Sequence, residues 1–212
     1  MTVLPYLLNS YGEATTLSGL LALTNSFIIA LRLRKLVVWK RLFPILITFI
    51  IISAFSIFTL KKFEDQTLRF ILGILLIIIS LYFVFFSGKI HIKTNIPTQI
   101  TVGTISGLMG GFFAMQGPPA VLYFLKSEID KEHYMAMLQC YLLLGNIGMT
   151  VSRASNGFLT ITVLQSYLYG IIGVIIGTSV GAIVFNKIPI KFFKYIVYGF
   201  IGISGVVILF NC

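Results

Sequence analysis

The sequence predicts an all-α protein: a polytopic membrane helix bundle built from two repeats of about four helices. The chain of 212 residues is 58% hydrophobic and only 10% charged, and its mean hydropathy is +1.00, which lies outside the range of soluble globular domains. Its apolar residues gather in runs close to the roughly 20 residues that cross a bilayer. The two halves of the chain also share polar and small residues at matching positions. We therefore treat 1–212 as a single transmembrane domain.

Seven apolar runs follow one another with short connections, at 14–31, 42–60, 68–86, 99–125, 133–152, 160–185 and 192–210. The fourth run is too long for one straight helix, and near its middle it contains three glycines and two adjacent prolines. In a helix interior Gly costs about 1 kcal/mol relative to Ala, and Pro costs roughly 3 kcal/mol. We therefore expect two half-helices that meet inside the membrane, and seven crossings in total.

The charged residues lie in the connections. The net charge is +10, but the basic residues are read as topology signals and headgroup contacts, not as a nucleic-acid surface. Five basic residues between 32 and 41 make that side cytoplasmic by the positive-inside rule, although seven single crossings leave eight basic residues on each side. The same crossings place every acidic residue on the opposite side. These residues are Glu13, Glu64, Asp65, Glu128, Asp130 and Glu132.

The N-terminus shows no cleavable signal peptide, so the spans themselves must direct insertion into the cell membrane. The two cysteines, Cys140 and Cys212, have neither metal-ligand spacing nor a plausible disulfide framework. We expect no metal and no cofactor.

An internal repeat relates the two halves of the chain through slides of 121 and 126 residues. The aligned pairs are Asn25 and Asn146, Arg32 and Arg153, Ser53 and Ser179, Lys61 and Lys187, and Gly73 and Gly199. The first repeat covers 1–98 and the second covers 99–212, which opens with the broken segment. The counterpart of that segment would begin before Met1, and only residues 4–8 resemble its second limb, 121–125. We therefore expect the first repeat to be truncated at its N-terminus.

These residues resemble the sulfite exporter TauE/SafE family of membrane permeases, over nearly the whole chain. The glycine-rich stretch that leads into Gly-Pro-Pro and an apolar limb carries most of the resemblance. It comprises Gly110, Gly111, Gly117, Pro118, Pro119, Tyr123 and Leu125. Spaced glycines and an aromatic-basic helix start add weaker support. These are Gly170, Gly173, Gly177 and Gly181, followed by Phe192, Phe193 and Lys194.

The resemblance implies transport of small anions such as sulfite or organosulfonates. A half-helix that begins inside the membrane presents unpaired N–H groups and about +0.5 charge, which suits an anion. We expect free N–H groups at Ala120, Val121 and Leu122, close backbone approach at the glycines, and a side-chain donor from Gln116. The candidate binding residues are Asn25, Gly110, Gly111, Gln116, Gly117, Pro118, Pro119, Ala120 and Asn146.

A purely structural interpretation stays open for each of these residues. The Gly and Pro residues also suit a packed kink, and the two Asn residues suit interhelical hydrogen bonds of about 0.6 kcal/mol. Arg32 and Arg153 lie at helix ends, where snorkelling to lipid headgroups is the default and an anion gate is the alternative.

Among other function classes, an enzyme is disfavoured because no Asp or Glu lies deep in a span. A non-transporting interaction subunit or degenerate paralogue is the alternative function. Lipid is an expected partner, and the sequence leaves a homo-oligomer open.

Overall fold

The computed structural model describes residues 8, 10–86, 94–128, 130–187 and 190–210. Within these residues the chain is all helical, as predicted. The α-helices are α2 (Tyr11–Leu33), α3 (Trp39–Leu60), α4 (Asp65–Phe86), α5 (Ile96–Phe113), α6 (Gly117–Ser127), α7 (Lys131–Ser155), α8 (Ile161–Lys187) and α9 (Ile190–Phe210). The predicted remnant of a first broken helix at 4–8 lies, except for Leu8, outside the described residues.

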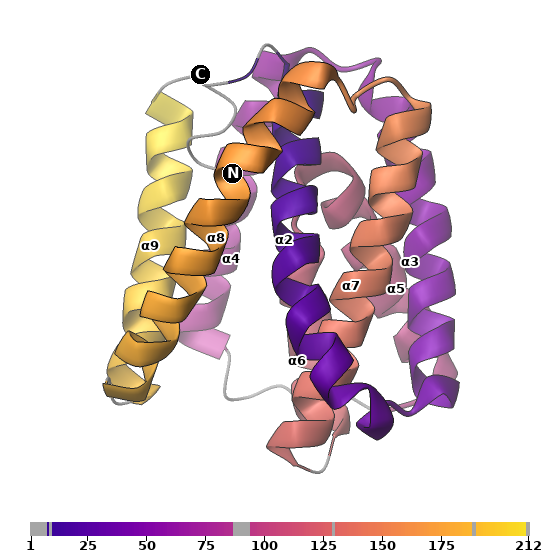
Figure 1. The fold of residues 1–212 in the computed structure, drawn as a ribbon, viewed down its shortest axis with the longest axis vertical. Coiled ribbons are helices and arrows are strands. Elements are labelled where there is room, and N and C mark those ends of the chain that lie inside the picture. The colour runs from indigo at the N-terminus through magenta and orange to yellow at the C-terminus, as the bar shows by residue number, and fades with distance from the viewer. Residues whose placement is uncertain (1–7, 9, 87–93, 129, 188–189, 211–212) are drawn as a thin grey trace.

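The long helices lie side by side and reverse direction at each connection (Figure 1). Five described helical segments are long and apolar enough to cross a membrane: Tyr11–Leu36, Trp39–Leu60, Asp65–Tyr82, Glu132–Ser155 and Ile161–Val180. The start of α2 is fixed to the start of α4, because the Tyr11 N–H donates to Asp65 Oδ2 at 2.8 Å. We call the end of the bundle that contains this bond the Tyr11 end.

The opposite end of the bundle contains the short connection from α2 to α3, and we call it the Arg41 end. Arg41 Nη1 lies 3.6 Å from Glu128 Oε2, and it donates to the Ser127 carbonyl oxygen at 3.5 Å. The last residues of α6 therefore lie beside the first residues of α3. The turn between α6 and α7 is at the lower end of the view in Figure 1.

The broken segment is a hairpin, so the predicted single crossing of 99–125 is wrong. Its two limbs run antiparallel, since Gln99 Nε2 near the start of α5 donates to the Tyr123 hydroxyl near the end of α6 at 3.0 Å. The segment rises from the Arg41 end, breaks between Phe113 and Gly117, and returns to the Arg41 end. Sequence periodicity reveals helices but not their direction, so it could not distinguish a hairpin from a kinked crossing.

The hairpin also overturns the prediction that all acidic residues share one side. Glu128 pairs with Arg41, and Asp130 and Glu132 begin α7 at that same end. Glu13, Glu64 and Asp65 lie at the Tyr11 end. Arg153, in the last turn of α7, also lies at the Tyr11 end, opposite the basic cluster at 32–41.

Glycines allow α5 to pack closely along α3. A Cβ atom added at Gly103 would lie 2.8 Å from the Ile45 carbonyl oxygen, and one added at Gly107 would lie 2.8 Å from the Ile52 Cβ. Small residues at every fourth position let two helix backbones approach each other in this way. The close contact holds the hairpin against the bundle, beside a core cluster that includes Phe49, Ala120, Tyr123, Phe124 and Tyr141.

Candidate functional site

The break between α5 and α6 is built on an unusual backbone conformation at Ala114. Its φ of 55° and ψ of 30° place it in the left-handed region, and it is the one non-glycine residue with positive φ among the described residues. The Ala114 N–H donates to the Gly110 carbonyl oxygen at 3.0 Å, which ends α5. A left-handed conformation costs an L-residue roughly 1–2 kcal/mol, and such strained residues cluster at functional sites.

The second limb begins at Gly117, so Pro118 and Pro119 occupy the first turn of α6. Prolines fit there because a helix leaves its first N–H groups without partners, and Pro has none to lose. The first-turn positions that keep an N–H are therefore Gln116 and Gly117. This is one turn earlier than the sequence suggested, and Ala120 itself is fully buried in the core.

The Gln116 side chain lies inside the break and is only 3% exposed. Its Nε2 donates to the Leu142 carbonyl oxygen of α7 at 3.3 Å, while its Oε1 has no hydrogen-bond partner among the described residues. Its Cβ lies over Gly110, and its amide lies over Gly145. Gln116 therefore joins both limbs of the hairpin to α7, and an unsatisfied oxygen remains in the interior.

Arg153 closes the other side of the break. Its side chain is 2% exposed, and its Nη2 donates to the carbonyl oxygens of Gly110 and Gly111 at 3.1 and 3.0 Å. These carbonyls belong to the last turn of α5, where the helix dipole places negative charge. Arg32 is exposed, so snorkelling stays a prediction for it, whereas the buried Arg153 side chain turns into the bundle.

The structure brings most of the predicted site residues together. Gly110, Gly111, Gln116, Gly117, Pro118 and Pro119 surround the break. A Cβ added at Gly117 would meet nothing within 4 Å, so open space adjoins the first turn of α6. Asn146 follows Gly145 on α7 and is 3% exposed.

Asn25 contacts α8. Its Oδ1 accepts a hydrogen bond from Thr178 Oγ1 at 3.4 Å. The hypothesis that Asn25 and Asn146 flank one site therefore rests on the repeat alone.

Sequence reasoning missed three features of the break: the strained Ala114, the buried Arg153, and the hydroxyl of Tyr11. The sequence held one indication that Arg153 could be buried: it lies eight residues beyond Gly145 on a helix that packs against the hairpin. The sequence does not say which face of that helix meets α5. Tyr11 is fully buried, and its hydroxyl has no hydrogen-bond partner in the described part of the chain.

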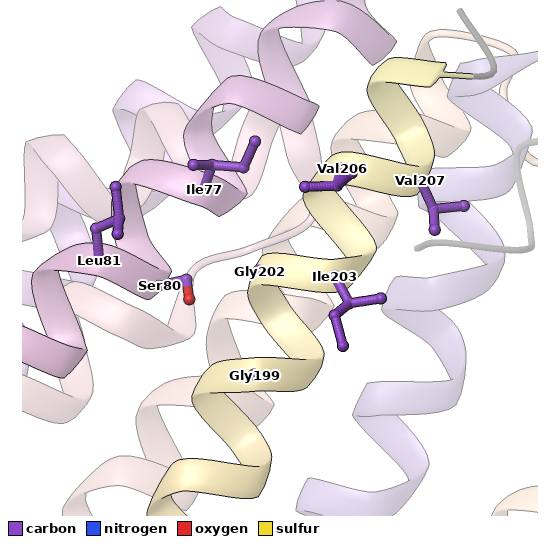
Figure 2. A pocket seen from close by; sticks show the side chains of 8 residues that line it. All are labelled: Ile77, Ser80, Leu81, Gly199, Gly202, Ile203, Val206 and Val207. Carbon is purple, nitrogen blue, oxygen red and sulfur yellow. The ribbon is translucent and has the colours of Figure 1, made fainter.

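An open groove of about 400 Å³ lies elsewhere, between α4 and α9 (Figure 2). It is lined by Ile77, Ser80, Leu81, Gly199, Gly202, Ile203, Val206 and Val207. None of these side chains is charged, and none belongs to the break. Among the described residues, no group of three or more His, Cys, Asp or Glu side chains is arranged to hold a metal ion.

These features define a polytopic membrane protein with a helical hairpin that breaks inside the bundle and that collects hydrogen-bond donors and a buried cation there. The family model described as "Sulfite exporter TauE/SafE" matches residues 1–208, so the chain belongs to this family of transporters. No curated protein and no solved structure matches the chain significantly.

Proposed function

We propose that the protein transports small anions such as sulfite across the cell membrane and holds the anion at the break between α5 and α6. The observation that carries this proposal is the imbalance of charge at the break. Two helix ends meet there, the carbonyl end of α5 and the N–H end of α6. Arg153 neutralises the carbonyl end, so the positive end of α6 dominates the local field.

The first turn of α6 supplies the donors. The Gln116 and Gly117 N–H groups have no carbonyl earlier in their own helix to bond, and the space next to Gly117 is open. An anion leaving water loses its hydration shell, and fixed backbone donors replace part of that shell without burying another formal charge. Broken helices with exposed N-termini bind anionic substrates in the same way in other transporters.

The test is sulfite flux into liposomes that contain the purified full-length chain. We expect Gly117→Leu to lose most of the flux, because the leucine side chain would fill the open space at the donors. The matched control is Gly173→Leu on α8, since Gly173 likewise has no neighbour within 4 Å but lies away from the break. Equal flux from wild type, Gly117→Leu and Gly173→Leu would contradict the proposal.

The second candidate function is a non-transporting membrane subunit, and the exposure of α8 favours it. Ile172, Ile175, Ile176 and Val180 are each more than half exposed. Such a face suits another helix as well as lipid. Wild-type protein that is folded in liposomes but carries no sulfite would support this candidate.

A further inference from the structure

Arg153 is a buried cation that forms no ion pair with a carboxylate of the described residues. Among the described residues the ion pairs are Arg41 with Glu128 and His133 with Asp130, and neither includes Arg153. Glu13 and Asp65 lie at the same end of the bundle, but no described ion pair joins either of them to Arg153. Glu13 Oε1 accepts from Thr160 Oγ1, Glu13 Oε2 is buried without a partner among the described residues, and Asp65 Oδ2 accepts from the Tyr11 N–H. Burying an ion costs several kcal/mol unless charge compensates it. An ionisable residue inside a membrane span that bears this cost usually serves a function.

The protein uses only part of the hydrogen-bonding capacity of the Arg153 guanidinium. Its Nη2 bonds the two glycine carbonyls at the end of α5, while its Nη1 is buried and has no hydrogen-bond partner among the described residues. A buried charged donor that lacks a hydrogen-bond partner costs free energy of folding. The stability of the fold alone therefore does not explain why Arg153 Nη1 is buried there.

Tyr11 supplies a second unused donor at the same end of the bundle. Its ring is fully buried at the start of α2, and the bond from its N–H to Asp65 holds that helix start in place. Its hydroxyl also has no partner in the described part of the chain. The Tyr11 ring belongs to the same buried cluster as Phe113, and Phe113 ends the turn of α5 whose Gly110 and Gly111 carbonyls bond Arg153.

We propose that Arg153 and Tyr11 bind the transported anion directly, with Arg153 Nη1 and the Tyr11 hydroxyl each donating to an oxygen of a small oxyanion. This inference rests on the proposed function and names the groups that select its substrate. An N–H of a guanidinium donates a charge-assisted hydrogen bond to an anionic oxygen, which sulfite and sulfonates both carry. The anion then supplies the missing counter-charge, so a neutral molecule of the same size binds poorly.

A purely structural role for Arg153 makes a different prediction. If Arg153 only caps α5, its loss lowers the stability of the protein without sulfite and leaves the sulfite affinity unchanged. If it binds the anion, its loss weakens the affinity, whatever happens to the stability. The dissociation constant for sulfite and the melting temperature without sulfite therefore separate the two roles.

The experiment is calorimetric titration of the purified full-length protein with sodium sulfite, and with neutral methanesulfonamide as a probe of similar size. We expect Arg153→Gln to weaken sulfite binding about tenfold to hundredfold, as the loss of a hydrogen bond to a charged group implies. Arg153→Lys keeps the charge and should lose less. Tyr11→Phe removes one neutral donor and should weaken binding about threefold to tenfold. Methanesulfonamide should not bind measurably.

The matched control is Arg32→Gln, because Arg32 is the repeat equivalent of Arg153 and is exposed. It should leave the affinity unchanged. The inference is overturned if Arg153→Gln and Tyr11→Phe both bind sulfite as tightly as wild type, and the proposed function then survives. If Arg153→Gln does not fold, Tyr11→Phe and Arg153→Lys decide by the same criterion. If wild type itself binds no sulfite, both the inference and the proposed function fail.

Discussion

Helices α3 and α8 occupy equivalent positions in the two predicted repeats, but their surroundings differ. The glycines of α5 press against the backbone of α3, and Phe49 of α3 is fully buried. On α8, Gly173 and Gly177 have no neighbour within 4 Å, and Ile175 is 54% exposed. Figure 1 shows α8 at one side of the bundle, with α3 and α5 on the other side.

The comparison teaches that a glycine stripe does not by itself specify packing. The stripe at Gly103, Gly107 and Gly111 becomes a close helix interface because α3 presents a complementary face. On α8, Gly173 and Gly177 have the same spacing, but a Cβ added at either would meet no described atom within 4 Å. A shared place in the repeat likewise does not specify burial. Arg32 and Arg153 are equivalent in the repeat but differ in burial, because only Arg153 meets the end of α5.

The largest expected effect concerns the direction in which the two repeats cross the membrane. In a variant without Cys140 and Cys212, a cysteine at Lys35 or Asp130 should be labelled from one side of the membrane by an impermeant thiol reagent. A cysteine at Asp65 or Gly157 should be labelled from the other side. The α5–α6 hairpin requires this result, because α3 and α8 then begin on opposite sides.

A single crossing by residues 99–125 predicts another pattern, in which Asp130 labels together with Asp65. That pattern would contradict the hairpin, and it would also contradict the conclusion that α3 and α8 begin on opposite sides of the membrane. The positive-inside rule adds that the Lys35 side is cytoplasmic, so both Lys35 and Asp130 should be shielded in intact cells.

A smaller effect separates the two glycine stripes. Gly107→Ala should destabilise the protein by about 1–3 kcal/mol, because the new methyl group would overlap Ile52 in a packed interface. Gly177→Ala should be neutral or slightly stabilising, since it meets open space and Ala favours a helix. Thermal unfolding in detergent measures both. Equal losses at the two glycines would mean that α8 is covered by another helix in the sample.

The smallest effect concerns the starts of α2 and α7, which correspond in the repeat. Ser10 caps α2, whereas Asp130 caps α7 and accepts from the N–H groups of Glu132 and His133. The backbone N–H of His133 and then its ring hold the pKa of the Asp130 carboxyl below its ordinary value of 3.8. Because this pKa is lowered by folding, the cap stabilises α7 above the unfolded-state pKa and is lost as the pH falls through the folded-state pKa.

Hydrogen exchange in the first turn of α7 should therefore accelerate at acidic pH more than exchange in the first turn of α2, after correction for the intrinsic rates. Asp130→Ser should remove this pH dependence, since serine caps without a titrating group. An unchanged pH profile in Asp130→Ser would show that another group causes the acceleration.

Sequence reasoning located the helices and the break because glycine, proline and hydrophobic periodicity act locally. Phe113 and Gly117, which bound the break, lie within the predicted segment. The reversal of the chain at Ala114 was missed, since it depends on a left-handed conformation that no glycine marks. The burial of Arg153 was missed for a different reason. It is set by the hydrogen bonds of its side chain to the end of α5, and the identical spacing of Asn25 and Arg32 in the first repeat gave no sign of it.

The most direct test of the central claim, an anion site at the break, is stabilisation of the purified protein by sulfite. A ligand that binds only the folded state adds about 2.7 kcal/mol at 100 times its dissociation constant. We predict a rise in melting temperature for wild-type protein with sulfite, a smaller rise or none with chloride, and no rise for Gly117→Leu with either. An equal rise with sulfite in wild type and Gly117→Leu, or no rise in either, would contradict the claim and leave the break as a packing feature.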